Sequence, residues 1–366
     1  MARVTKAVAG THEVVAGAVR ARLAPLGAAG QLPLDASTTM ARANYAAVQS
    51  AARGAATLAA PLLAERTPAG ATPAAEQLPA AAWLAALGAA FGDQMVDDHR
   101  VRALTVPMSL RDNGARLLVE EQDGAALLED PSPDLVVFVH GLGNHEAVWG
   151  EAYLDVVREH GATPLTLRYT TGQAIADSGA ELADLLDGLV STWPVPVERI
   201  ILVGHSMGGL VIRAGLAAGG PWRGLVCDVI TLGTPHAGAP LERFAARSLA
   251  LAGTVPVIAP IVALGDERSV GIKDLGLAEV AAATAGPDWH LVAATLAQSD
   301  AASVLGRARA GVLGPLGDGL VTIDSAFAVE AHLTARRLVI ADASHMALLD
   351  HPDAVDVLRI VLTQPG

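Results

Sequence analysis

The chain has 366 residues, enough for one large domain with an appendage or for two modest domains. Hydrophobic residues make up 52% of it but aromatic residues only 3%, so small aliphatic side chains must build a core in which helices pack closely. The formal net charge of −13 argues against a nucleic-acid partner, because binding phosphates requires a basic face.

Residues 1–97 are predicted to form an N-terminal helical region. Apolar residues repeat at helical spacing from Val4 to Leu23, and two more helices are expected at about 38–63 and around Trp83. Three roles remain open for these helices: packing on the rest of the chain, covering its functional site, or forming a homodimer interface.

No targeting or membrane segment is expected. Glu13, Arg20 and Arg22 interrupt the apolar run that a signal peptide would need. The longest weakly polar stretch, 249–264, is too short and too broken by glycine and proline to span a membrane. The single cysteine, Cys227, lies in an apolar run and is interpreted as a small buried side chain. The sequence therefore favours a cytoplasmic protein without a transmembrane segment.

From about residue 98 the pattern changes to alternating strands and helices. Asp112-Asn113-Gly114 separates two short strand-like runs and is a strong hairpin signal, because Asn-Gly tolerates positive φ. Strands are expected at 104–110, 115–121, 135–139, 164–169, 200–203, 226–232, 290–296 and 338–341, and helices at 152–159, 174–192, 207–218 and 347–362. This order predicts an α/β domain over 98–366, with a mostly parallel, doubly wound sheet and an opening antiparallel hairpin.

A Gly-x-Ser-x-Gly pattern lies between an expected strand and an expected helix, at Gly204 to Gly208. Such a turn strains the serine backbone, and side chains at either glycine position would collide with the neighbouring strand and helix. The turn also lifts the serine hydroxyl above the carboxyl ends of the strands, where open α/β sheets place their sites. Ser206 is therefore the candidate nucleophile.

This segment resembles the nucleophile elbow of α/β-hydrolase lipases and esterases, and three further motifs agree in order and spacing over about residues 103–364. One of them, His140-Gly141-Leu142, follows the first long parallel strand. The resemblance implies that the backbone N–H groups of Leu142 and Met207 form an oxyanion hole. We expect His140 to be a structural histidine that braces this loop, and His145 and Trp149 to line the mouth of a pocket.

The resemblance also orders the catalytic partners as serine, then acid, then histidine. His345 follows the last strand in a Ser-His-x-x-Leu-Leu pattern and is the candidate base. Asp318, between two glycines, is the candidate acid that would fix the tautomer of the imidazole. Asp342 and Asp324 remain as alternative acids.

The fourth motif, Gly-Thr-Pro-His-Ala-Gly at 233–238, resembles a loop of bacterial triacylglycerol lipases and of the glycosylphosphatidylinositol-deacylase group. His236 comes too early in the order to be the base and is expected to be structural. The range of about 239–316 is predicted to hold a lid-like insertion, with a core helix pair as the alternative.

Together these motifs imply a carboxylic-ester hydrolase that works through an acyl-enzyme, without cofactor or metal. Its substrate would be a small-molecule or lipid-like ester of undetermined chain length. An acyltransferase on the same fold, or an inactive hydrolase fold used for binding, remain as alternatives.

Overall fold

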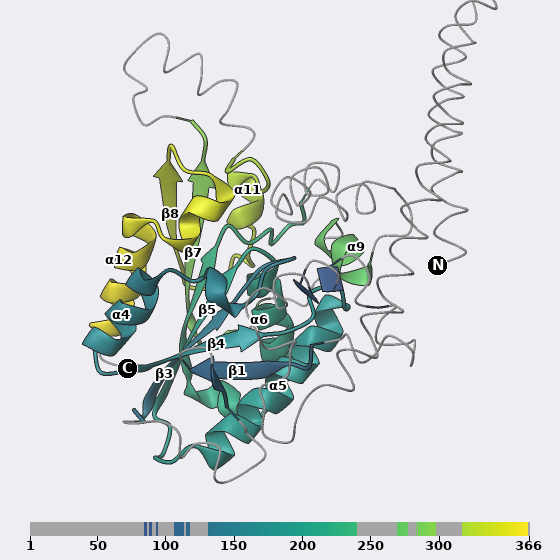
Figure 1. Cartoon of the computed structure of the whole chain (residues 1–366). Coiled ribbons are helices and arrows are strands. Elements are labelled where there is room, and N and C mark those ends of the chain that lie inside the picture. The colour runs from purple at the N-terminus through teal and green to yellow at the C-terminus, as the bar shows by residue number, and fades with distance from the viewer. Residues whose placement is uncertain are drawn as a thin grey trace, which may run out of the picture.

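The computed structural model (Figure 1) describes residues 84, 85, 88, 89, 93, 106–112, 115–117, 131–239, 269–276, 283, 285–297 and 317–364. Most of the N-terminal helical region and the stretches 240–268 and 298–316 of the expected insertion lie outside these residues. The roles suggested for both segments, including the homodimer and the lid, therefore stay predictions.

Within the described residues, eight strands form one sheet in the order β2-β1-β4-β3-β5-β6-β7-β8. The strands are β1 (Ser109–Asp112), β2 (Ala115–Arg116), β3 (Asp134–Val139), β4 (Thr163–Arg168), β5 (Arg199–His205), β6 (Val226–Leu232), β7 (Asp288–Thr295) and β8 (Ala335–Ala341). β1 runs antiparallel to β2 and β4, whereas the neighbours from β4 to β8 are all parallel. The predicted mostly parallel sheet with its opening hairpin is confirmed.

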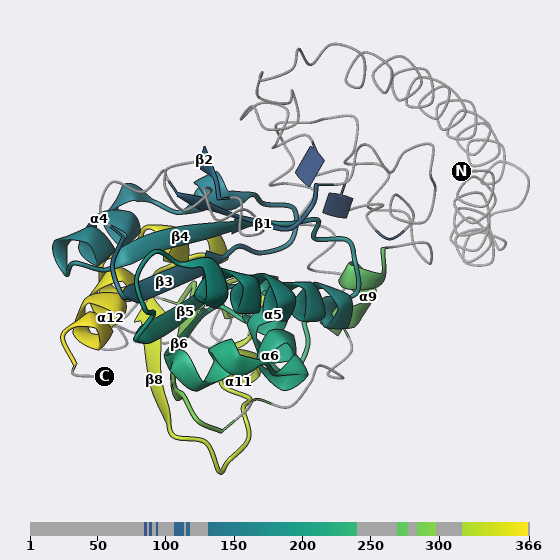
Figure 2. The same cartoon turned by 90° about the horizontal axis from the view of Figure 1, so that it is seen from below.

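Helices cover both faces of the sheet (Figures 1 and 2). The α-helices are α4 (Glu151–Glu159), α5 (Ile175–Thr192), α6 (Met207–Ala218), α9 (Val270–Gly276), α11 (Ile323–Ala326) and α12 (Pro352–Leu362), and the 3-10 helices are η5 (Glu146–Val148), η6 (Pro221–Leu225) and η9 (His345–Leu349). Side chains of β3 alternate between the two layers. Leu135, Val137 and Val139 pack with α5 and α6, while Val136 and Phe138 pack with α4 and α12. A strand buried on both faces explains the unbroken apolar run in this part of the sequence.

Small residues let α5 and α6 cross closely, as the composition predicts. A Cβ atom added to Gly179 would lie only 2.4 Å from the Cβ atom of Ala214. Any larger side chain at position 179 would push the two helices apart and open the core beneath them. Because α6 begins directly after the serine turn, this crossing also fixes the direction of the helix that follows Ser206.

Two element boundaries differ most from the sequence-based expectation. β1 occupies Ser109–Asp112 rather than 104–110. The last α-helix begins at Pro352 rather than at 347, because a 3-10 turn occupies the preceding residues. Proline has no N–H to donate and so favours the first turn of a helix, and the His351 side chain caps that turn by accepting the Asp353 amide.

The few described residues near position 90 contact α9. The hydroxyl of Ser269 donates to the carbonyl of Ala89 at 2.7 Å, and the amide of Val270 donates to the Asp93 carboxylate at 3.3 Å. β7 lies within the range of about 239–316 that was expected to hold the insertion. Because β7 pairs with β6 and β8, this part of the range belongs to the central sheet.

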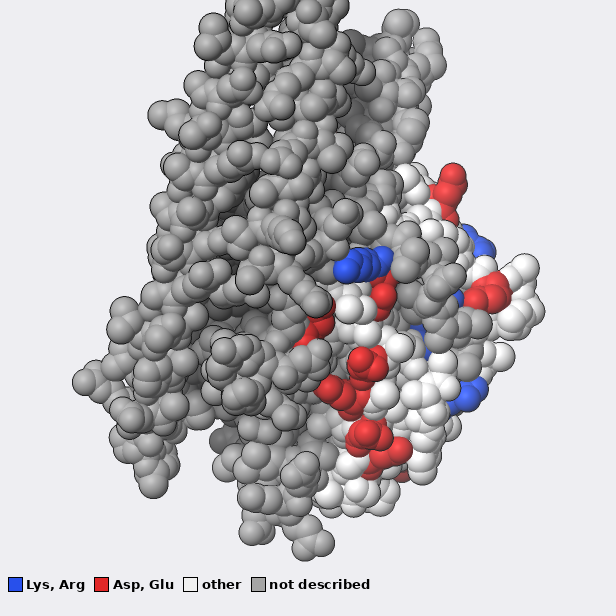
Figure 3. All heavy atoms as spheres, turned by 90° about the vertical axis from the view of Figure 1, so that its right-hand side faces the viewer, with Lys and Arg blue, Asp and Glu red and all other residues white. Residues whose placement is uncertain are grey.

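Acidic side chains gather on the described part of the face that Figure 3 shows. On α5, burial and the neighbouring charges of Asp177 and Asp184 raise the pKa of Glu181. None of the described helices has both the length and the apolar character needed to cross a membrane.

Candidate active site

Ser206 occupies a sharp turn between β5 and α6. Its backbone has φ 54° and ψ −124°, a region that residues with a side chain rarely adopt. The flanking glycines make the turn possible: a Cβ atom at Gly208 would lie 2.1 Å from the Val139 carbonyl oxygen, and one at Gly204 would lie 2.6 Å from the Gly209 nitrogen. A conformation of this kind costs about 1–3 kcal/mol and persists only where the surrounding structure enforces it.

Ser206 is buried, and its hydroxyl makes no hydrogen bond to the residues that the structure describes. Its amide donates to the Leu232 carbonyl at 2.9 Å, which ties the turn to the end of β6. On its other side, a Cβ atom at Gly141 would lie 2.9 Å from the Ser206 Cβ atom. The loop after β3 therefore contacts the serine directly.

His345 and Asp318 form a buried pair, with His345 Nδ1 2.7 Å from Asp318 Oδ2. The other carboxylate oxygen, Oδ1, accepts the amides of Leu320 at 2.9 Å and Val321 at 2.8 Å. These bonds fix the carboxylate, and the His345 amide donates to the Asp318 carbonyl at 3.2 Å, which joins the two loops. A proton on Nδ1, facing the carboxylate, leaves Nε2 as the basic nitrogen.

Gly233, directly after β6, locates this pair relative to the serine turn. A Cβ atom at Gly233 would lie 3.0 Å from both Asp318 Oδ2 and His345 Nδ1, and the preceding residue accepts the Ser206 amide. The imidazole rings of His205 and His345 are 4.6 Å apart, and His205 Nε2 lies 3.1 Å from the His345 carbonyl oxygen. The structure thus places the His345–Asp318 pair beside Gly233, whose preceding residue binds the serine turn, at the carboxyl ends of the parallel strands.

The two alternative acids, Asp342 and Asp324, do not contact the His345 imidazole. Asp342 and Asp324 are both exposed, whereas Asp318 is 1% exposed. Asp342 takes up a left-handed conformation with φ 57°, at the turn that leaves β8. Only Asp318, among the three candidates, has its carboxylate on the His345 imidazole.

His236 is held in the protein core. Its ring lies 3.2 Å from both the Thr231 hydroxyl and the Arg213 guanidinium. Burial, with a smaller contribution from the charge of Arg213, lowers the pKa of His236 to about 3. The ring is therefore neutral near pH 7, which agrees with the expected structural role.

The predictions for the aromatic residues near the loop after β3 are only partly met. His140 is fully buried, and its ring stacks on Tyr169 at 4.5 Å. Burial is the main cause that lowers the pKa of His140 to about 4. The expectation for Trp149 is wrong: its ring lies 5.0 Å from Phe138 and 5.6 Å from Tyr153 in the core, and it is 4% exposed. His145 caps η5 by accepting the Ala147 amide.

The two expected oxyanion donors flank the serine. Met207 is the first residue of α6, and Leu142 follows the glycine that contacts the Ser206 side chain. Neither amide donates to another backbone group of the described residues. A backbone amide without an acceptor can bind negative charge without first breaking a hydrogen bond.

Three residues at the site escaped the sequence analysis. Tyr169 and Thr171, just beyond β4, bind the loop that contains Leu142, and His205 contacts His345. Because these contacts join strands that are distant in sequence, no spacing pattern could indicate them. Burial and the adjacent His345 hold the pKa of His205 well below its usual value.

Metal ligands are not gathered at the site: within the described ranges, no three His, Cys, Asp or Glu side chains lie together as a metal ion would need.

Comparisons with known proteins agree with this architecture. The model of a family called PGAP1-like alpha/beta domain matches residues 174–252, a range that contains the serine turn and the 233–238 loop. No curated protein matches the chain.

Several solved structures are similar in part. The mature lipase BlEst2 of Bacillus licheniformis is 22% identical, with 65% of this chain and 96% of that chain covered and a TM-score of 0.45. The esterase Pf2001 of Pyrococcus furiosus is 15% identical, with 63% and 83% covered and a TM-score of 0.41. A thermophilic esterase of Thermogutta terrifontis is 16% identical, with 63% and 90% covered and a TM-score of 0.36. The chain has the α/β-hydrolase fold, with the strand order given above and the PGAP1-like alpha/beta match around the serine turn.

Proposed function

We propose that the protein is a serine hydrolase of carboxylic esters, with Ser206 as nucleophile, His345 as general base and Asp318 as the acid that orients it. The observation that carries this proposal is the buried His345–Asp318 pair at the strand ends beside a strained serine turn. A serine hydroxyl is a weak nucleophile near neutral pH and needs such a base.

In the proposed reaction, the Ser206 oxygen attacks the ester carbonyl while His345 Nε2 takes the hydroxyl proton. Negative charge then develops on the former carbonyl oxygen, which the amides of Leu142 and Met207 bind. The tetrahedral intermediate collapses to an acyl-enzyme, and His345 returns the proton to the leaving alcohol. Water activated by the same imidazole completes the cycle and restores the free hydroxyl.

Hydrolysis of p-nitrophenyl esters from acetate to palmitate tests the proposal. The wild-type protein should release p-nitrophenol with saturation kinetics, and Ser206→Ala should lose at least about 10⁴-fold in kcat. Full turnover after this substitution would contradict the proposal. The same series reveals the preferred acyl length, and product analysis in added alcohol distinguishes hydrolysis from acyl transfer, because both share the acyl-enzyme.

A further inference from the structure

The loop between β3 and η5 is bound by the residues that follow β4. The hydroxyl of Tyr169 donates to the His140 carbonyl at 2.7 Å, and the Thr171 hydroxyl accepts the Gly143 amide at 3.1 Å. A buried ion pair between Arg168 and Glu146 ties the far end of the same loop, with Arg168 Nε 2.7 Å from a Glu146 oxygen. Three nearby positions thus hold one short loop.

The first two bonds enclose the expected oxyanion donor. His140, two residues before Leu142, has its carbonyl bound, and Gly143, one residue after, has its amide bound. Gly143 has φ 72° and the Asn144 amide donates to the Gly141 carbonyl at 3.2 Å, so Leu142 lies in a tight turn. The Leu142 peptide therefore lies between two anchored groups, while its own amide stays unbound within the described backbone.

Both hydroxyls belong to buried side chains. Thr171 is 1% exposed, Tyr169 is 3% exposed and His140 is fully buried. Removing the Tyr169 hydroxyl would leave the buried His140 carbonyl without this partner, and removing the Thr171 hydroxyl would release the amide of the half-buried Gly143. The loop would respond by shifting or by becoming mobile.

We propose that Tyr169 and Thr171 are positioning residues that hold the Leu142 amide where the oxyanion develops. This inference rests on the proposed function. An oxyanion hole works because its donors are already in place when charge forms, and a displacement of about 1 Å can lower a rate by up to about 100-fold. The bonds should therefore matter more in the transition state than in the bound substrate.

Thr170 supplies a matched control. It is a neighbouring threonine, 5% exposed, but its hydroxyl bonds the amide and carbonyl of Val106, both at 3.1 Å, outside the loop. Thr170→Val and Thr171→Val remove the same atom from equally buried positions. Only the second should change the geometry around Leu142.

The test compares Thr171→Val, Thr171→Ser, Tyr169→Phe and Thr170→Val in the full chain, using p-nitrophenyl butyrate and thermal unfolding. Thr171→Val and Tyr169→Phe should each lower kcat about tenfold with KM changed less than about twofold. Thr171→Ser keeps the oxygen that accepts the Gly143 amide, so its kcat should stay near the wild-type value. Thr170→Val should keep kcat even where its Tm falls as much as that of Thr171→Val.

A boronic acid that adds to the serine measures the same effect at equilibrium. Its inhibition constant should rise in Thr171→Val by the factor that kcat/KM falls, because the adduct mimics the tetrahedral intermediate. Wild-type kcat in both Thr171→Val and Tyr169→Phe, or equal losses in Thr170→Val and Thr171→Val, would overturn the positioning role alone. If Thr171→Val does not fold, Tyr169→Phe carries the test, since it removes a single oxygen. A folded wild-type protein that hydrolyses no ester would instead remove the proposed function and this inference together.

Discussion

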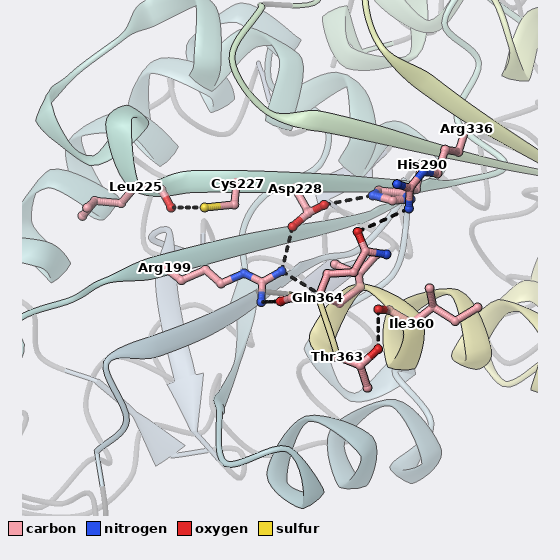
Figure 4. A network of polar contacts seen from close by, with 10 residues as sticks. Arg199, Leu225, Cys227, Asp228, His290, Arg336, Ile360, Thr363 and Gln364 are labelled. Carbon is pink, nitrogen blue, oxygen red and sulfur yellow. Dashed lines mark hydrogen bonds and ion pairs between the residues drawn. The ribbon is translucent and has the colours of Figure 1, made fainter. Parts of the chain in front are cut away.

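The described residues contain two buried His–Asp pairs at opposite ends of the sheet. His345 and Asp318 meet at 2.7 Å beyond the carboxyl ends of the strands, where the serine turn also lies. His290 and Asp228 meet at 2.9 Å near the beginnings of β7 and β6. Figure 4 shows the second pair together with Arg199 and the end of the chain. Similar geometry therefore occurs in two very different settings.

The partners of each carboxylate make the difference. Asp318 accepts two neutral backbone amides, so its charge remains available to an imidazolium that forms during a reaction. Asp228 also accepts Arg199 at 2.9 Å, and the same guanidinium donates to the carbonyls of Val361 and Gln364 near the end of α12. The second pair thus ties the last helix to the sheet. A His–Asp distance alone does not identify a catalytic site, so the proposed function also depends on the strand end and on the other partners of the carboxylate.

The largest expected contrast lies between the two histidines. His345→Ala should lower kcat by at least about 10⁴-fold, because it removes the general base, and it should also lower stability, because the buried Asp318 carboxylate loses a partner. His290→Ala should leave the kcat of the folded protein within about twofold but cost about 1–3 kcal/mol in unfolding free energy, since Asp228 loses a buried partner. Ester hydrolysis and urea unfolding measure the two effects. Equal losses of kcat in both variants would remove the distinction.

The carboxylates should show the same contrast on a smaller scale. Asp318→Asn should lower kcat by about 10³- to 10⁴-fold, because the amide no longer holds the reactive tautomer. Asp228→Asn should preserve kcat and lower stability by about 3 kcal/mol, because the buried Arg199 charge loses its counter-ion. Measuring kcat at the same fraction of folded protein for both variants separates the effect on catalysis from the effect on stability. A catalytic defect in folded Asp228→Asn would show that the second network also supports the site.

Much of this site can be predicted from the sequence, for local reasons. The serine turn needs glycines at fixed positions within five residues, and both collide with neighbours when a Cβ atom is added. The motifs around Asp318 and His345 could be recognised for the same reason, because each consists of a few consecutive residues. The placement of β4 between β1 and β3, and the bonds from Tyr169 and Thr171, could not be predicted, because they depend on pairing between distant segments. Trp149 was misplaced for that reason too: an aromatic residue near a loop can face either the site or the core.

The second network should also have a pH signature. Burial alone would raise the pKa of Asp228, but hydrogen bonds from His290 and Arg199 outweigh this effect and hold the pKa below the ordinary value of 3.8. A carboxylate with a lowered pKa stabilises the fold above its unfolded pKa, and this contribution disappears as the pH falls through the folded pKa.

Wild-type stability should therefore fall more steeply below about pH 4 than that of Asp228→Asn. Urea unfolding at pH 5 and pH 3 measures the change for both proteins. Parallel curves for the two proteins over this range would mean that the Asp228 pKa is not lowered by folding.

Labelling with a fluorophosphonate, located by mass spectrometry, tests the central claim most directly. The reagent bonds covalently to a serine only where a base activates it and an oxyanion site receives the phosphonyl oxygen. A single adduct on the peptide that contains Ser206 is expected in the wild-type protein and in His290→Ala, with labelling at least about 10³-fold slower in His345→Ala. An adduct on another residue, or equal labelling rates in His345→Ala and His290→Ala, would contradict the account.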